Sequence, residues 1–144
     1  MRSAIRRFTC TAAVGVLSTA AGVALAAGTL PPVESQHGVA YLSGGIGQGE
    51  AQAIEHAAGQ WPLAMEFAQR RGRHDDYIAD VAVVVRDAAH HTVLTAKSDG
   101  PFMLARLAPG HYIVDATFGD RTLHDQVRVN EHGTARAVFV WPNA

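Results

Sequence analysis

Histidine is the residue type in this chain whose abundance first suggests chemistry. Neutral imidazole is a common zinc ligand, but a zinc site needs several ligands that converge on one point. No His-x-His or His-Glu-x-x-His spacing occurs in the sequence. We therefore interpret the histidines as surface residues and name no metal ligand, while a response to pH below about 6.5 stays open as an alternative. The eight are His37, His56, His74, His90, His91, His111, His124 and His132.

Charged residues gather just before the middle of the chain. His74-Asp75-Asp76 is expected to form a polar, solvated loop, with weak cation binding left open as an alternative, and Asp80 extends this acidic group. The basic run Arg70-Arg71-Gly72-Arg73 precedes it, and opposite charges so close in sequence are expected to neutralise each other at a solvated surface. Another pair, His90-His91, falls in a predicted turn.

A glycine-rich run, Gly44-Gly45-Ile46-Gly47, stands before a predicted helix. Such turns can present backbone N–H groups to an anion. No Lys, Arg, Ser or Thr follows at phosphate-loop spacing, so we interpret the run as a strand-to-helix turn that lets the backbone approach the sheet. Glu50 and Glu55 then complement the positive end and the solvent face of the helix.

No residues are placed for nucleophilic catalysis. The sequence has no Gly-x-Ser-x-Gly elbow, and Ser98 belongs to the turn Ser98-Asp99-Gly100-Pro101. We therefore name no catalytic residue, no cofactor and no cofactor-binding residue.

The elements that would have to position any site are mostly strands. From residue 77 to residue 144 apolar residues alternate with polar ones, and turn signals recur every 8–12 residues, which is the pattern of an antiparallel β-sandwich. We predict six strands in this half. Their inward residues include Val81, Val83 and Val85, then Tyr112, Val114, Ala116 and Phe118, then Leu123, Val127 and Val129, and finally Ala137, Phe139 and Trp141.

The earlier part of the chain differs in pattern. Residues 27–37 contain Pro31-Pro32 and no apolar periodicity, which predicts a flexible lead-in, with order beginning at Val39. Residues 38–76 predict a strand-helix-strand segment: a helix of about ten residues ends near Gly59, and a half-buried strand starts at Leu63. We expect the apolar face of this helix to pack on the sheet or beside it.

The N-terminal residues predict where the protein is located in the cell. A basic start is followed by an uncharged apolar run from Thr11 to Ala26, which is typical of a secretory signal peptide over residues 1–26. The run is poorer in strongly apolar residues than the ~20 that a membrane span needs, so we expect no stable membrane insertion after cleavage. A periplasmic or secreted location follows from this prediction.

Cleavage would change the charge and remove the only thiol. Loss of Arg2, Arg6 and Arg7 from 12 Lys and Arg leaves 9 against 13 Asp and Glu, so the net charge moves from −1 to −4. An acidic domain attracts phosphate backbones little, and we expect no nucleic-acid partner. Cys10 is the single cysteine, so the mature chain would hold together by packing, without disulfides.

Three segments resemble the carboxypeptidase regulatory-like domains, which share a transthyretin-like sandwich. They are the strand Val81–Arg86 with Asp87, the turn Ser98-Asp99-Gly100-Pro101-Phe102, and the run from Leu107 to Val114 with its Ala-Pro-Gly-His-Tyr core. The resemblance spans roughly residues 80–140. It implies a fold used for support, adhesion or carbohydrate-related binding, and it names no single chemistry.

The front part, from Tyr41 to Ala68, is similar to small uncharacterised exported proteins of Gram-negative bacteria that join such a segment to a sandwich. That resemblance implies the periplasm and no activity. Hydroxyisourate hydrolases use the same fold and end in Tyr-Arg-Gly-Ser, whereas this chain ends Phe139-Val140-Trp141-Pro142-Asn143-Ala144, so the catalytic motif is missing.

The sequence as a whole predicts an exported, non-enzymatic binding or structural module, with a protein or glycan partner of unknown identity. The competing hypothesis is a metal-binding protein or metal-dependent hydrolase built on the histidines and the acidic loop. A third hypothesis is that the glycine-rich turn and the helix move to regulate access to an edge strand, which allows partner recognition by strand addition.

Overall fold

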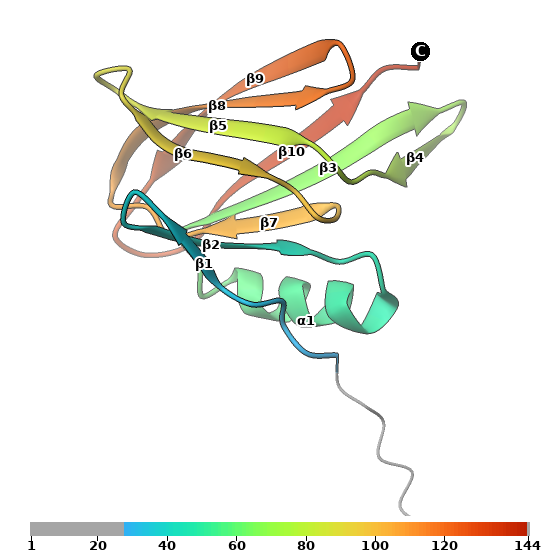
Figure 1. Ribbon diagram of the computed structural model, residues 1–144, viewed down its shortest axis with the longest axis horizontal. Helices are drawn as coiled ribbons and strands as arrows, with labels where there is room; N and C mark the ends of the chain where they lie inside the picture. The colour runs from blue at the N-terminus through green and yellow to red at the C-terminus, as the bar shows by residue number, and fades with distance from the viewer. Residues whose placement is uncertain (1–27, 144) are drawn as a thin grey trace, which may run out of the picture.

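A computed structural model describes residues 28–143 of the chain, which form one helix and ten strands arranged as two stacked sheets (Figure 1). The predicted mainly β sandwich is confirmed. The predicted signal peptide lies outside the described residues. Among residues 28–143, no helix has both the length and the apolar character needed to cross a membrane.

The first sheet has the strand order β1-β2-β7-β3-β10, and β4 pairs with the far end of β3. The second sheet has the order β6-β5-β8-β9. The strand bounds in the first sheet are β1 Glu34–Gln36, β2 Val39–Gly44, β3 Leu63–Arg71, β4 His74–Tyr77, β7 Phe102–Ala105 and β10 Ala135–Trp141. Those in the second sheet are β5 Ala82–Asp87, β6 Thr92–Lys97, β8 Gly110–Phe118 and β9 Arg121–Val129.

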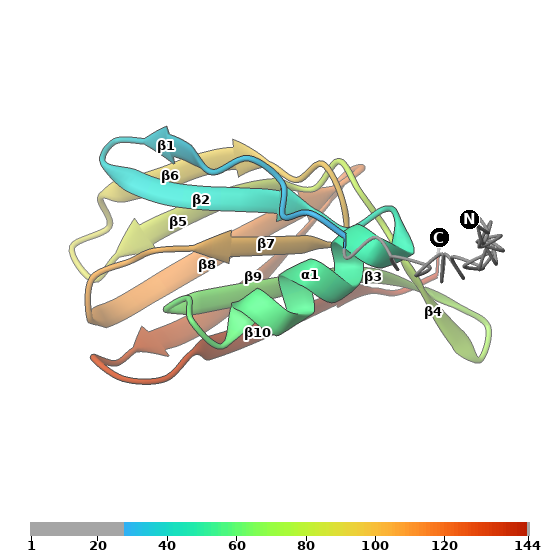
Figure 2. The same ribbon diagram turned by 90° about the horizontal axis from the view of Figure 1, so that it is seen from below.

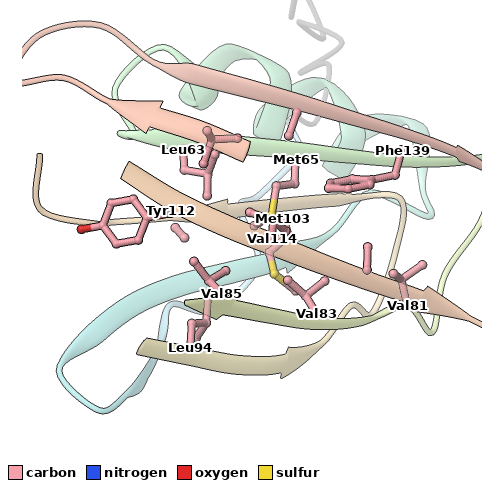
Figure 3. Packing of buried hydrophobic residues seen from close by; sticks show 14 of the residues in the cluster. Leu63, Met65, Val81, Val83, Val85, Leu94, Met103, Tyr112, Val114 and Phe139 are labelled. Atoms are coloured by element: carbon pink, nitrogen blue, oxygen red, sulfur yellow. The ribbon is translucent and has the colours of Figure 1, made fainter. Parts of the chain in front are cut away.

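Alternating apolar side chains from the two sheets meet in one core. Val83 and Val85 on β5 and Val114 on β8 are fully buried, as their spacing predicted. They face Leu63 and Met65 on β3 (Figure 3). Each such burial contributes roughly 1.5–3 kcal/mol, and this packing replaces the disulfides that the described chain lacks.

The pairing of β3 with β10 is parallel, from Ala135 opposite Leu63 to Trp141 opposite Gln69. The prediction of a wholly antiparallel sandwich is therefore wrong at this pair. Antiparallel neighbours can be joined by a short hairpin, whereas a parallel pair needs a long crossover. Here the crossover consists of every element from β4 to β9, so no local turn signal marks the pair in the sequence.

The division of the chain at residue 77 does not correspond to two structural units. β2 and β3 are strands of the first sheet, and β3 lies between β7 and β10. The expectation that β3 is half-buried is also wrong, because Ala64 and Ala68 on its outer face are buried as well, at 8% and 4% exposure. The strand-helix-strand segment is thus part of the sandwich itself.

Regular structure begins earlier than Val39. β1 forms an antiparallel hairpin with β2 around His37 and Gly38, both of which have positive φ. The side-chain carbonyl of Gln36 accepts a hydrogen bond of 2.6 Å from the Thr95 N–H on β6. The predicted lead-in over residues 27–37 therefore contains a strand that also ties the two sheets together along one side.

β4 was also unforeseen, because residues 74–76 were expected to form a loop. Instead the chain turns at Gly72, with φ of 62°, and β4 pairs antiparallel with β3. Arg70 forms an ion pair with Asp75, and Arg71 lies 3.9 Å from Asp76. The expected mutual neutralisation of these charges is confirmed.

The helix α1 runs from Gln48 to Ala58 and ends at the cap Gly59, close to its predicted end. Ile54 and Ala58 are buried against the outer face of the first sheet, where they join Leu42, Phe102 and Leu104 in a second apolar cluster. Figure 2 shows α1 lying lengthwise over that sheet. The expectation that the helix packs on the sheet is confirmed.

Candidate functional site

The histidines do not come together. Among residues 28–143 there is no group of three His, Cys, Asp or Glu side chains placed to hold a metal ion. His37 and His90 lie in turns with φ of 50° and 63°. His111 is exposed on β8, and His124 is exposed on the neighbouring β9.

Within residues 28–143 two histidine side chains lie beside a carboxylate. His91 Nδ1 lies 3.6 Å from Asp87 Oδ2 in the turn after β5, and the other contact lies on the outer face of the second sheet. His124 Nδ1 contacts one carboxylate oxygen of Asp115, and the Arg86 guanidinium binds the other. The Asp115 side chain is only 18% exposed and the Arg86 side chain 34%. We call Arg86, Asp115 and His124 the charge row; the Arg86 guanidinium and the His124 ring each occupy one oxygen of the Asp115 carboxylate, so we interpret the row as a structural feature of this face.

A shallow hollow of about 430 Å³ continues this face along β8 and β9. Its polar members are His111, Gln126 and Arg128, and the rest of the lining is Ala88, Tyr112, Ile113 and Val127. The polar members can donate and accept hydrogen bonds beside an apolar lining. We call this surface, with the charge row, the polar face.

Ser98 has a structural role. Its side chain is fully buried, and its Oγ accepts a hydrogen bond of 3.1 Å from the Val81 N–H. On the opposite side of the turn, Ser43 Oγ accepts a hydrogen bond of 3.1 Å from the Asp99 N–H. Both hydroxyls satisfy backbone groups, which accounts for the two buried serines without a catalytic role.

The glycine turn binds a carboxylate of its own chain. Glu50 Oε1 accepts a hydrogen bond of 2.7 Å from the Gly45 N–H. Gly45 has φ of 99°, and a Cβ there would lie 2.5 Å from the Phe102 ring. The backbone therefore approaches the sheet closely, as the sequence suggested, and Glu50 already occupies the position that an external anion would take.

A groove lies beside α1 on the outer face of the first sheet. The helix contacts chiefly β7 and β2, and leaves the strip over β3 and β10 less covered. The resulting hollow has a volume of about 250 Å³. We call it the helix–strand groove; it is lined by Ile54, Glu55 and Ala58 of α1, Ala64, Met65 and Glu66 of β3, Phe102 and Leu104 of β7, and Arg136, Ala137 and Val138 of β10.

Small side chains make the floor of the groove, and large apolar ones remain exposed around it. Ala64 is one of its floor residues and lies beside the taller Glu66 side chain on the same strand face. On β10, Val138 is 60% exposed, and Tyr77 at the end of β4 is 58% exposed. Exposed large apolar side chains beside a hollow are typical of an interaction surface.

Two carboxylates give the groove an acidic side. Burial raises the pKa of Tyr77, and the negative charge of Glu66, a hydrogen bond to Glu66 and the charge of Glu55 raise it further. The Tyr77 ring also packs on Phe102, with 5.3 Å between ring centroids. The aromatic ring, its neutral hydroxyl and two acids therefore form one end of the surface, and Arg136 supplies the positive charge on β10.

The sequence did not predict the groove, because β3 and β10, which lie side by side in it, are far apart in the sequence. Glu66 and Val138 are opposite each other only through the parallel β3–β10 pairing. One signal was present: Ala64 and Ala68 flank Glu66 at strand spacing, so the outer face of that strand had to be shallow.

Comparison of the chain with protein-family models, with curated proteins and with solved structures finds no match. The candidate surfaces therefore stand on the geometry of the chain itself.

Proposed function

We propose that this chain is an exported, non-enzymatic binding module of the carboxypeptidase regulatory-like type, and that it captures a protein partner in the helix–strand groove. The observation that carries the proposal is the half-covered outer face of the first sheet. There Val138 and Tyr77 remain 60% and 58% exposed beside a hollow lined by both acidic and apolar side chains. The partner that fits is a segment with apolar side chains and a basic residue.

The charge distribution supports this chemistry. Glu55 and Glu66 both act on the Tyr77 hydroxyl, so a Lys or Arg side chain placed there would meet two carboxylates and an aromatic ring. The mature chain would also be acidic overall, which favours approach of a basic segment. The polar face lacks this combination, because Asp115 is already bound by Arg86 and His124.

Site-specific photo-crosslinking in exporting cells tests the groove. A benzophenone side chain in place of Tyr77 is expected to capture a defined partner, and the same group in place of Thr122 on the polar face is not. Glu66→Gln, combined with the probe at Tyr77, is expected to lower the yield of the adduct about threefold to tenfold. Equal adducts at both positions, or a yield unaffected by Glu66→Gln, would overturn the assignment. A glycan bound through the polar face would do so as well.

Export is tested separately. The processed chain is expected in the periplasmic or extracellular fraction with a mass that places its first residue just after Ala26 or Ala27. A chain that keeps Met1 and stays in the cytoplasm would contradict the export part of the proposal and would leave the groove to be judged by crosslinking.

For the competing metal hypothesis, the strongest candidate ligands are His124 and Asp115, which are in contact on the polar face. Elemental analysis of protein purified without a histidine tag is expected to give far less than one zinc or copper per chain. A stoichiometric metal that disappears in His124→Ala would replace the binding-module proposal with the metal-dependent alternative.

A further inference from the structure

The exposed edges of the two sheets are guarded unequally. Natural proteins protect edge strands by making them short, by covering their N–H groups, or by placing a charge on the inward side. β1 has three residues. On β6 the Thr95 N–H is already bonded to Gln36. On β9 the half-buried Asp125 lies on the inward side, between Leu123 and Val127. A strand added to this edge would bury the Asp125 carboxylate, which disfavours the pairing.

β10 has none of these guards. It is seven residues long, and its inward residues Ala137, Phe139 and Trp141 are apolar. Its outward residues are Arg136, Val138 and Val140, with Val138 more than half exposed. Within residues 28–143 no strand pairs with its second side.

The backbone geometry defines which groups β10 offers. The Ala135 N–H donates to the Pro62 carbonyl at 2.9 Å, so Ala135 directs its backbone groups toward β3. Backbone groups of successive residues in a strand alternate in direction, and the next odd-numbered residues therefore also face β3. The N–H and C=O groups of Arg136, Val138 and Val140 face the open edge.

We propose that β10 pairs antiparallel with β10 of a second copy of this chain, with a two-fold axis at Val138. In this register Val138 lies opposite Val138 of the second copy, and Arg136 lies opposite Val140. The three free residues on each strand then satisfy one another completely. The two Arg136 charges are kept apart by about four strand residues, roughly 13 Å.

Self-pairing of this kind fits the side chains as well as the backbone. The exposed Val138 side chains cover each other on the outer face, and the aliphatic stem of Arg136 packs along Val140. Because Asp125 guards β9, we expect the first sheet alone to become continuous across the axis. The area is small, so the dimer is weak, with a dissociation constant in the micromolar range or above.

The dimer would complete the outer surface. Each helix–strand groove is open on the β10 side, and the second copy would supply the next two strands and a facing α1. The inference does not depend on the proposed function, because dimer formation is measured without any partner.

Cysteine crosslinking tests the register. In a full chain carrying Cys10→Ser, Val138→Cys is the only thiol, and it is expected to form the oxidised dimer about tenfold faster than Thr95→Cys on the opposite edge strand. Arg136→Cys alone crosslinks slowly, whereas a mixture of Arg136→Cys and Val140→Cys forms the mixed dimer. Equal rates at positions 138 and 95, or rapid self-crosslinking at 136, would overturn the register.

Sedimentation equilibrium tests the backbone pairing. Val138→Pro removes an N–H that faces the open edge and none that bonds to β3, so the circular dichroism spectrum is expected to persist while the dimer is lost. Val138→Thr keeps both the N–H and the branched side chain and is the matched control, expected to dimerise like the parent. A parent chain that is monomeric even at millimolar concentration overturns the proposal, as does a Val138→Pro chain that is folded and still dimeric.

Discussion

The outer faces of the two sheets differ in how they meet solvent. On the first sheet, α1 buries Ile54 and Ala58, and the strip beside it keeps Val138 exposed. Within residues 28–143 no helix lies on the second sheet, whose outer face carries mainly polar residues with the charge row of Arg86, Asp115 and His124. The outer face of the second sheet is therefore suited to contact with solvent, whereas that of the first sheet is covered only in part.

The difference has a physical origin in the strands beneath. β3 carries alanines on its outer side, and a sheet surface of small apolar residues gains stability when another element covers it. On the outer side of β8 and β9 most side chains are polar, with Ile113 as the apolar exception, so this face loses less by remaining in contact with solvent. The proposed binding of a partner therefore rests on the incomplete cover over β3 and β10.

The largest expected difference between the two faces is in the stability lost when one isoleucine on each face is truncated to alanine. Ile54 is 1% exposed under the helix, so Ile54→Ala is expected to lower the free energy of unfolding by about 2–5 kcal/mol. Ile113 lies partly exposed on the polar face, and Ile113→Ala is expected to cost less than about 1 kcal/mol. Urea unfolding of both variants gives the values, and equal losses would show that α1 contributes no more packing than the open face.

Neutralising one acid on each face should change the free energy of unfolding less than the isoleucine truncations do. Here the larger loss is expected on the second sheet. Asp115→Asn leaves the Arg86 guanidinium without its carboxylate partner, and is expected to lower the free energy of unfolding by about 1–2 kcal/mol. Glu66→Gln removes no ion pair found within residues 28–143 and is expected to change stability by less than about 0.5 kcal/mol.

The same pair of variants separates stability from binding. Glu66→Gln is expected to weaken partner capture at Tyr77, while Asp115→Asn leaves it intact at temperatures where the chain is folded. If Glu66→Gln lowers the free energy of unfolding as much as Asp115→Asn does, Glu66 stabilises the fold, which would contradict its assignment to partner binding.

The smallest effect is in the alkaline titration of the tyrosines. Burial, followed by the charge and hydrogen bond of Glu66, raises the pKa of Tyr77 above its ordinary value of 10.0. Because the folded chain favours the protonated hydroxyl, its contribution to stability is complete below pH 10 and is lost as the pH rises through the folded pKa. Glu66→Gln should lower the Tyr77 pKa, as followed by absorbance at high pH; Tyr112, whose pKa is raised by burial and by Asp87, is the internal control.

Local patterns in the sequence were sufficient for most of the fold. Alternation placed Val83, Val85 and Val114 in the core, and Gly59 marked the end of the helix, because these features depend on neighbours in the chain. β1 and β4 were missed, since each is stabilised by hairpin pairing with a longer strand while its own residues are mostly polar. The parallel β3–β10 pair was missed because its partners are far apart in sequence.

The candidate site depended on that missed pair, which explains why residues of interest in the sequence did not become the site. Histidines stand out by number, yet they are spread over turns and outward strand positions. Glu66, Val138 and Tyr77 belong to no motif in the sequence. They lie near one another only because of the strand topology.

Amide hydrogen exchange along β10, measured residue by residue over a range of protein concentrations, tests the central claim most directly. At high dilution the account predicts slow exchange for Ala135, Ala137, Phe139 and Trp141, which face β3, and fast exchange for Arg136, Val138 and Val140, which slow down as the concentration rises. Protection of all seven residues at every dilution, or the reverse alternation, would contradict an open, parallel-paired β10.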